Sequence, residues 1–109
     1  MKPDLPPLLT RYVDAQNGHD IEAMLACFAP NAWVRDEGKV MTGTAAVGGW
    51  IRDTSAKYRI TLEPMSYSAT PDGGTIVAKV SGTFPGSPIN LTYRFGFATD
   101  GRIAALEIG

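Results

Sequence analysis

The sequence predicts an α+β fold in which helices cover one face of an antiparallel sheet. Apolar residues recur every three or four positions through much of the first half of the chain, a spacing typical of amphipathic helices. In the second half they mostly alternate with polar residues, as they do in half-buried strands. Helices followed by a run of strands indicate α+β rather than α/β. The length of 109 residues fits a single domain spanning residues 1–109.

Two helices are expected at the start of the chain. The first covers residues 6–17, because its two prolines suit a first helical turn and the Asn-Gly pair that follows suits a helix end. The second covers residues 21–28, with Asp20 as its N-cap and Pro30-Asn31 as its stop.

A third helix is expected over residues 42–57, with Trp50 in its inner stripe. Gly48 and Gly49 inside this helix each cost about 1 kcal/mol relative to alanine. Close packing against the sheet would explain them.

The remaining segments are expected to be strands separated by turns. Gly38-Lys39 breaks the first strand, and the turn at residues 72–74 separates two later ones. The expected strands cover residues 32–37, 59–69, 75–84, 89–98 and 102–108.

Composition excludes several classes of protein. The net charge of -1 and the absence of a basic cluster argue against a nucleic-acid-binding surface. One cysteine, Cys27, permits no internal disulfide, and with His19 as the one histidine no metal site is expected. No signal peptide and no apolar membrane span are visible. We therefore expect a cytoplasmic protein that does not bind a membrane.

Six short segments carry a recognisable family pattern: residues 11–13, 18–24, 28–32, 34–38, 42–47 and 100–103. Together they resemble the helices, the first strand and the final hairpin of the nuclear-transport-factor-2-like superfamily, in particular SnoaL-like proteins and ketosteroid isomerases. This resemblance spans nearly the whole chain. It implies a cone in which a curved, mainly antiparallel sheet and three N-terminal helices enclose an apolar pocket. It also implies a homodimer and chemistry without a cofactor.

The resemblance carries two catalytic residues over to this chain. Tyr12 occupies the position of the isomerases' oxyanion-binding tyrosine, and Asp36 that of their proton-shuttling aspartate. Tyr93 stands where the isomerases have a protonated aspartate, and Ile51 where some relatives have a supporting tyrosine. A tyrosine hydroxyl can donate the same hydrogen bond as that aspartate.

The strand period gives Asp36 an independent reading. It shares a face with Val34, so an inward Val34 brings Asp36 inward, where burial would raise its pKa toward that of a useful base. Alternatively, Asp36 lies at the strand end and caps a turn or meets Arg11, Arg35 or Lys39. A one-residue shift in register would instead turn Arg35 and Glu37 inward.

The expected wall of the pocket consists of inward-facing residues of the helices and strands. These are Tyr93, Val34, Trp50, Ile51, Val80, Phe84, Leu91, Phe95 and Leu106.

Two functions follow as hypotheses. The first is an isomerase or polyketide-cyclase-like enzyme in which Asp36 moves a proton next to a carbonyl of a small hydrophobic molecule. The second is a non-catalytic module that binds a hydrophobic ligand or forms a dimer. An epoxide hydrolase of this fold needs an Asp-Arg-Asp set in the pocket, and Arg94 is expected to face outward.

Overall fold

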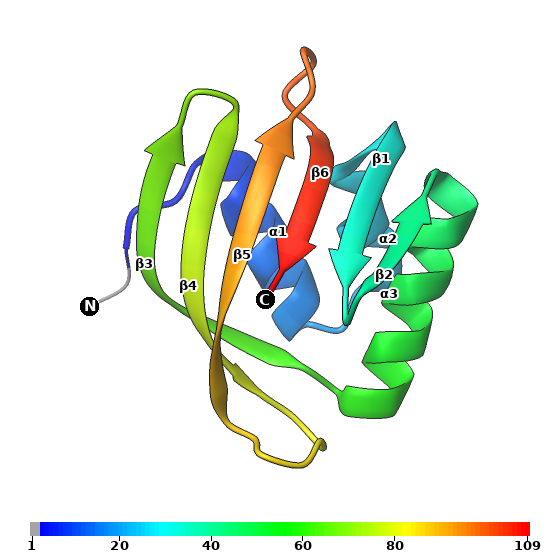
Figure 1. Ribbon diagram of the computed structural model, residues 1–109, viewed down its shortest axis with the longest axis vertical. Coiled ribbons are helices and arrows are strands. Elements are labelled where there is room, and N and C mark those ends of the chain that lie inside the picture. Colours follow the sequence, from blue (N-terminus) through cyan, green and yellow to red (C-terminus); the bar gives the residue numbers. More distant parts are fainter. Residues whose placement is uncertain (1–2) are drawn as a thin grey trace.

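Six strands form one curved sheet, and three helices pack beside it (Figure 1). The structure is a computed structural model that describes residues 3–109. Its elements are α1 (Pro7–Asn17), α2 (Ile21–Ala26), β1 (Phe28–Asp36), β2 (Lys39–Thr42), α3 (Thr44–Tyr58), β3 (Thr61–Thr70), β4 (Gly73–Ser81), β5 (Ile89–Phe97) and β6 (Ile103–Ile108).

The strand order is β2-β1-β6-β5-β4-β3. Strands β1 and β6 pair in parallel, and the other neighbours pair antiparallel. Helices α1 and α2 lie on one side of the sheet, and α3 lies against its β1–β2 end (Figure 1). The predicted α+β class with a mainly antiparallel sheet is confirmed.

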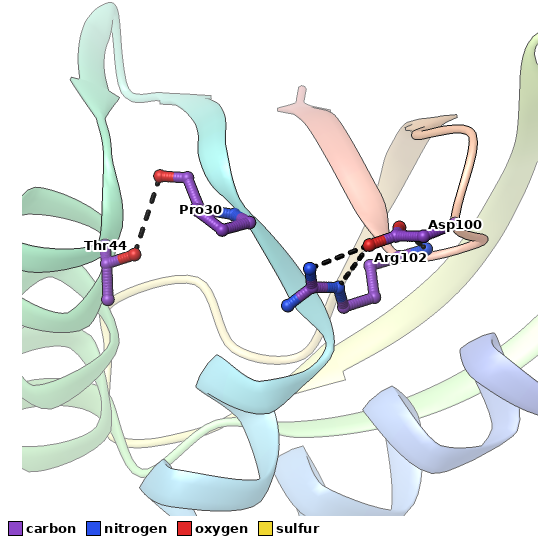
Figure 2. A network of polar contacts seen from close by, with 4 residues as sticks. All are labelled: Pro30, Thr44, Asp100 and Arg102. Atoms are coloured by element: carbon purple, nitrogen blue, oxygen red, sulfur yellow. Dashed lines mark hydrogen bonds and ion pairs between the residues drawn. The ribbon is translucent and has the colours of Figure 1, made fainter.

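The second helix is shorter than predicted. Helix α2 ends at Ala26, and β1 runs through Pro30 and Asn31, which were expected to stop the helix. The strand tolerates a proline here because its register against β6 shifts between Phe28 and Trp33, so Pro30 has no ladder partner. The Thr44 hydroxyl donates to the Pro30 carbonyl at 3.5 Å, which connects α3 to β1 (Figure 2).

Strand β2 was not predicted. The Gly38-Lys39 pair was expected to end the first strand without a partner strand after it. Glu37 and Gly38 instead form a two-residue hairpin turn with φ values of 53° and 76°. Asp36 therefore pairs with Lys39 across the new hairpin. The turn fixes Asp36 as the last residue of β1, beside Trp50 of α3.

Glycines at the start of β4 belong to the sheet rather than to a turn. Strand β4 covers residues 73–81 instead of the predicted 75–84. A Cβ on Gly73 would overlap the Phe95 carbonyl, and one on Gly74 would lie 2.5 Å from the Tyr67 ring. These positions require glycine because neighbouring groups approach the backbone closely. The ends of β3, β5 and β6 differ from their predicted positions by at most two residues.

The last hairpin, between β5 and β6, is closed by an ion pair. The Arg102 Nε donates to the Asp100 carboxylate at 2.8 Å (Figure 2). Because both side chains are half exposed, this pair stabilises the turn only weakly.

The core lies between the helices and the inner face of the sheet. Alternate residues of β4 and β5 face inward as predicted, including Ile76, Ala78 and Tyr93. Gly48 of α3 packs against Leu25 of α2, where a Cβ would lie 3.3 Å from the leucine side chain, and not against the sheet as expected. No helix within residues 3–109 has the length and apolar character needed to cross a membrane.

Candidate functional site

A cavity of about 550 Å³ lies between helices α1 and α3, the inner face of the sheet and the loop after β4. Seven of the eleven predicted site residues line it: Tyr12, Asp36, Trp50, Val80, Phe84, Leu91 and Tyr93. The cavity therefore brings both predicted catalytic residues into one space. Its volume falls in the range typical of small-molecule sites.

The other four predicted residues do not line the cavity. Val34, Ile51 and Leu106 are fully buried in the core, where α3 covers the middle of β1. Phe95 is buried behind the tyrosines, with its ring centroid 5.7 Å from that of Tyr12. These positions share an inward face with cavity residues, but a neighbouring element fills the space above them.

The cavity wall also contains residues that sequence reasoning missed. Thr54 and Tyr58 continue the four-residue spacing of Trp50 along α3, and that spacing could have identified them. Gln16 follows Tyr12 by one turn of α1. Pro85 belongs to the loop between β4 and β5, whose path no periodicity predicts.

Asp36 lies half-buried at the edge of the cavity. Its carboxylate accepts a hydrogen bond of 3.0 Å from the indole nitrogen of Trp50. Burial raises the pKa of Asp36 above the ordinary aspartate value; the Trp50 bond lowers that pKa, and the charge of Glu37 raises it. A base that stays partly desolvated in this way is suited to proton transfer near neutral pH.

No cation pairs with Asp36 among the described residues. Arg35, its neighbour in β1, is exposed and lies 3.4 Å from Glu107 of β6. Val34 is buried, so the alternative register that would turn Arg35 inward does not occur.

Tyr12 is fully buried, and its hydroxyl has no hydrogen-bond partner within residues 3–109. The rings of Phe28 and Phe95 hold it edge-on, with centroids 5.8 and 5.7 Å away. Burial raises the pKa of Tyr12 well above its ordinary value, and nearby Tyr93, Cys27 and Asp36 raise it further. Tyr12 is therefore a neutral hydrogen-bond donor whose hydroxyl has no acceptor among the described residues.

Tyr93 lies on β5, close enough to raise the pKa of Tyr12 and to have its own pKa raised by Asp36. It is 4% exposed and stacks on Phe95 with centroids 6.3 Å apart. Burial raises its pKa, and the charge of Asp36 adds to this rise. Two neutral phenols and one carboxylate thus meet at one region of an apolar cavity.

Other reactive side chains lie elsewhere. His19 is exposed in the turn between α1 and α2, and Arg94 is exposed on β5. Cys27 is buried, and its thiol donates to the Ala23 carbonyl at 3.4 Å. Within residues 3–109, no three His, Cys, Asp or Glu side chains form a group that could hold a metal ion.

The fold and this cavity place the protein among the ketosteroid-isomerase-like, or nuclear-transport-factor-2-like, proteins. A protein with a ketosteroid isomerase-like fold from Catenulispora acidiphila, solved in complex with trimethylamine, has a TM-score of 0.83 and 21% identity, and the match covers 97% of this chain and 86% of that chain. SalBIII, an epoxide hydrolase/cyclase-like enzyme of pyran ring formation in the polyether salinomycin, has a TM-score of 0.75, 24% identity and coverages of 93% and 85%. At these identities the likeness shows the fold.

The chain belongs to the SnoaL-like domain family, whose model matches residues 9–106. It is also 42% identical to a candidate polyketide cyclase from Sinorhizobium meliloti, with a TM-score of 0.91. That match covers 97% of this chain and 96% of that chain. No curated protein matches the chain at a significant level.

Proposed function

We propose that this protein is an enzyme that moves a proton next to a carbonyl group of a small hydrophobic molecule, as an isomerase or a polyketide-cyclase-like enzyme. The observation that carries the proposal is the buried Tyr12 hydroxyl, which has no partner among the described residues and belongs to a side chain that lines the cavity. An unsatisfied buried hydroxyl costs about 1–3 kcal/mol, so a protein that keeps one has a use for it. The hydroxyl is covered in this structure, so a ligand oxygen would satisfy it after a shift of the side chains that separate it from the cavity.

The proposed reaction begins with removal of a proton by Asp36. Its carboxylate takes a hydrogen from the carbon next to the carbonyl, and the electron pair of that C–H bond forms a C=C bond. The carbonyl π pair moves to oxygen and gives an enolate. Tyr12 and Tyr93 donate hydrogen bonds to that oxygen, where the negative charge develops. Neutral phenols with raised pKa values keep their protons and so remain donors throughout.

The second half of the reaction returns the proton or uses the enolate. In an isomerase, Asp36 delivers its proton to another carbon and the double bond moves. In a cyclase, the enolate carbon attacks a second carbonyl carbon of the same molecule and the first carbonyl re-forms. The new alkoxide then takes up the proton that Asp36 removed, which returns Asp36 to its carboxylate form. Both outcomes use the same base and the same two donors. The 42% identity to a candidate polyketide cyclase favours the cyclase branch.

Hydrogen exchange tests the first step without knowledge of the natural substrate. β-Tetralone, a small bicyclic ketone, exchanges the hydrogens next to its carbonyl in D2O, which NMR follows directly. We expect the protein to accelerate this exchange and Asp36→Asn to lower the acceleration by about 10²–10⁴-fold, the usual contribution of a general base. Asp53→Asn removes an exposed carboxylate of α3 outside the cavity and serves as the matched control. If Asp36→Asn accelerates exchange as much as the wild-type protein does, proton transfer by Asp36 is ruled out.

A non-catalytic ligand-binding module is the second candidate. The Trp50 bond to Asp36 favours it, because a carboxylate that already accepts a hydrogen bond is stabilised as an anion. This candidate predicts that β-naphthol, which resembles the enol of β-tetralone, binds in the cavity while the wild-type protein leaves exchange at its background rate.

A homodimer stays a prediction. The outer face of the sheet carries Trp33, whose ring lies 5.9 Å from the Arg35 guanidinium carbon, and this face is the expected contact. Light scattering at micromolar concentration measures the mass, and a monomer mass would contradict the prediction. The cytoplasmic location likewise stays a prediction.

A further inference from the structure

Gln16 is the buried polar residue of the described core, with 5% of its surface exposed, and it lines the cavity. It lies on α1 one turn after Tyr12. Polar side chains are rarely buried unless their hydrogen-bonding groups are satisfied. The partners of its amide therefore show what the cavity is built to receive.

The amide nitrogen of Gln16 donates to the Ile60 carbonyl at 3.4 Å. Because a backbone carbonyl can only accept, the nitrogen and not the oxygen must face Ile60. The amide oxygen then has no partner within residues 3–109. The side-chain polar atoms that are both sealed and unpartnered are the hydroxyls of Tyr12 and Ser55, so the Gln16 oxygen is not sealed. The chain thus holds an open acceptor at the cavity wall.

The position of this acceptor relative to Tyr12 follows from helix geometry. Residues four apart on a helix share a face and are separated by about 6 Å along the axis. The cavity wall therefore carries the Tyr12 phenol, whose covered hydroxyl is a donor, and the Gln16 amide, whose oxygen is an acceptor. Apolar side chains such as Val80 and Leu91 form other parts of the wall.

We infer that the ligand is a hydroxyl-bearing carbonyl compound, and that Gln16 selects it by accepting a hydrogen bond from its hydroxyl group. This inference rests on the proposed function only for the placement of the carbonyl at Tyr12. Gln16 touches the ligand away from the reacting carbon, so it determines specificity and does not take part in proton transfer.

Binding of matched naphthols tests the inference. β-Naphthol places one oxygen at the tyrosines, and its derivatives with a second hydroxyl on the far ring add a donor. For the best-placed isomer we expect about 3- to 10-fold tighter binding than β-naphthol, the effect of one net hydrogen bond. Gln16→Met keeps the length of the side chain without the acceptor and should abolish this advantage, while its affinity for β-naphthol itself reports an intact cavity.

A ligand-side control needs no variant. Methylation of the second hydroxyl removes the donor, so the methyl ether should bind the wild-type protein without the advantage. The inference is overturned if no isomer binds better than β-naphthol, if the methyl ether keeps the advantage, or if Gln16→Met retains it. The ratio of affinities is independent of catalysis. If the protein does not accelerate exchange of β-tetralone but the ratio of affinities is as expected, the proposed enzymatic function is refuted and the role of Gln16 in binding still holds.

Discussion

Replacement of Tyr12 by phenylalanine should make the protein more stable and less active. The Tyr12 hydroxyl is fully buried without a partner among the described residues, and such a group costs about 1–3 kcal/mol. Tyr12→Phe removes the oxygen and keeps the edge-on contacts of the ring with Phe28 and Phe95. The free energy of unfolding should therefore rise by about 1–3 kcal/mol. For a domain of this size, each 1 kcal/mol raises the Tm by about 4–8 °C.

The same substitution removes a donor to the enolate oxygen. Loss of one such donor usually costs about 10²–10³-fold in rate, so exchange of β-tetralone should fall by that factor. Thermal unfolding followed by circular dichroism measures the gain in stability. Tyr93→Phe is the control, because the Tyr93 hydroxyl is not among the sealed, unpartnered atoms and its loss brings no comparable gain. A lower Tm for Tyr12→Phe would show that the hydroxyl has a partner in the folded protein and would refute the reasoning.

Three further predictions follow from the geometry. Because burial raises the pKa of Asp36, the rate of β-tetralone exchange should rise with pH through a midpoint above the ordinary aspartate pKa, which a pH profile measures. Trp50→Phe removes a hydrogen bond that lowers the pKa of Asp36, so this variant should have a higher midpoint. The folded state holds the Asp36 proton more tightly than the unfolded state, so this residue's contribution to stability falls as pH rises through that midpoint. Urea unfolding across pH should show a smaller fall for Asp36→Asn, and an unchanged fall would contradict the assignment. Gly73→Ala should lower the free energy of unfolding by about 1–3 kcal/mol or more, because the added Cβ overlaps the Phe95 carbonyl. Gly49→Ala, in open space on α3, should raise it by about 0.5–1 kcal/mol. Equal effects of the two substitutions in thermal unfolding would contradict the packing described for these glycines.

The long strands were predictable because burial follows the period of two. Along β4 and β5 the inward residues are apolar and most outward residues, such as Lys79, Thr92 and Arg94, are polar, so periodicity alone identified the faces. Strand β2 gives no such signal, since its four residues are mostly exposed and follow a tight turn. The end of α2 was hidden because Cys27 and Phe28 continue an apolar helical pattern although Phe28 already pairs with Ile103.

The candidate site was predictable only to the level of inward faces. Tyr12, Asp36 and Tyr93 were expected inside, and the structure places all three at one cavity. Whether an inward residue faces open space depends on the paths of α3 and of the loop between β4 and β5. For this reason Val34 lies in the core while Asp36, two residues further along β1, lines the cavity.

A crystal structure with β-naphthol bound tests the central claim most directly. We expect the naphthol oxygen within about 3 Å of the Tyr12 and Tyr93 hydroxyls, with the Asp36 carboxylate about 3 Å from the adjoining ring carbon. A naphthol with its oxygen turned toward the mouth of the cavity, and Tyr12 still without a partner, would contradict proton transfer at this site.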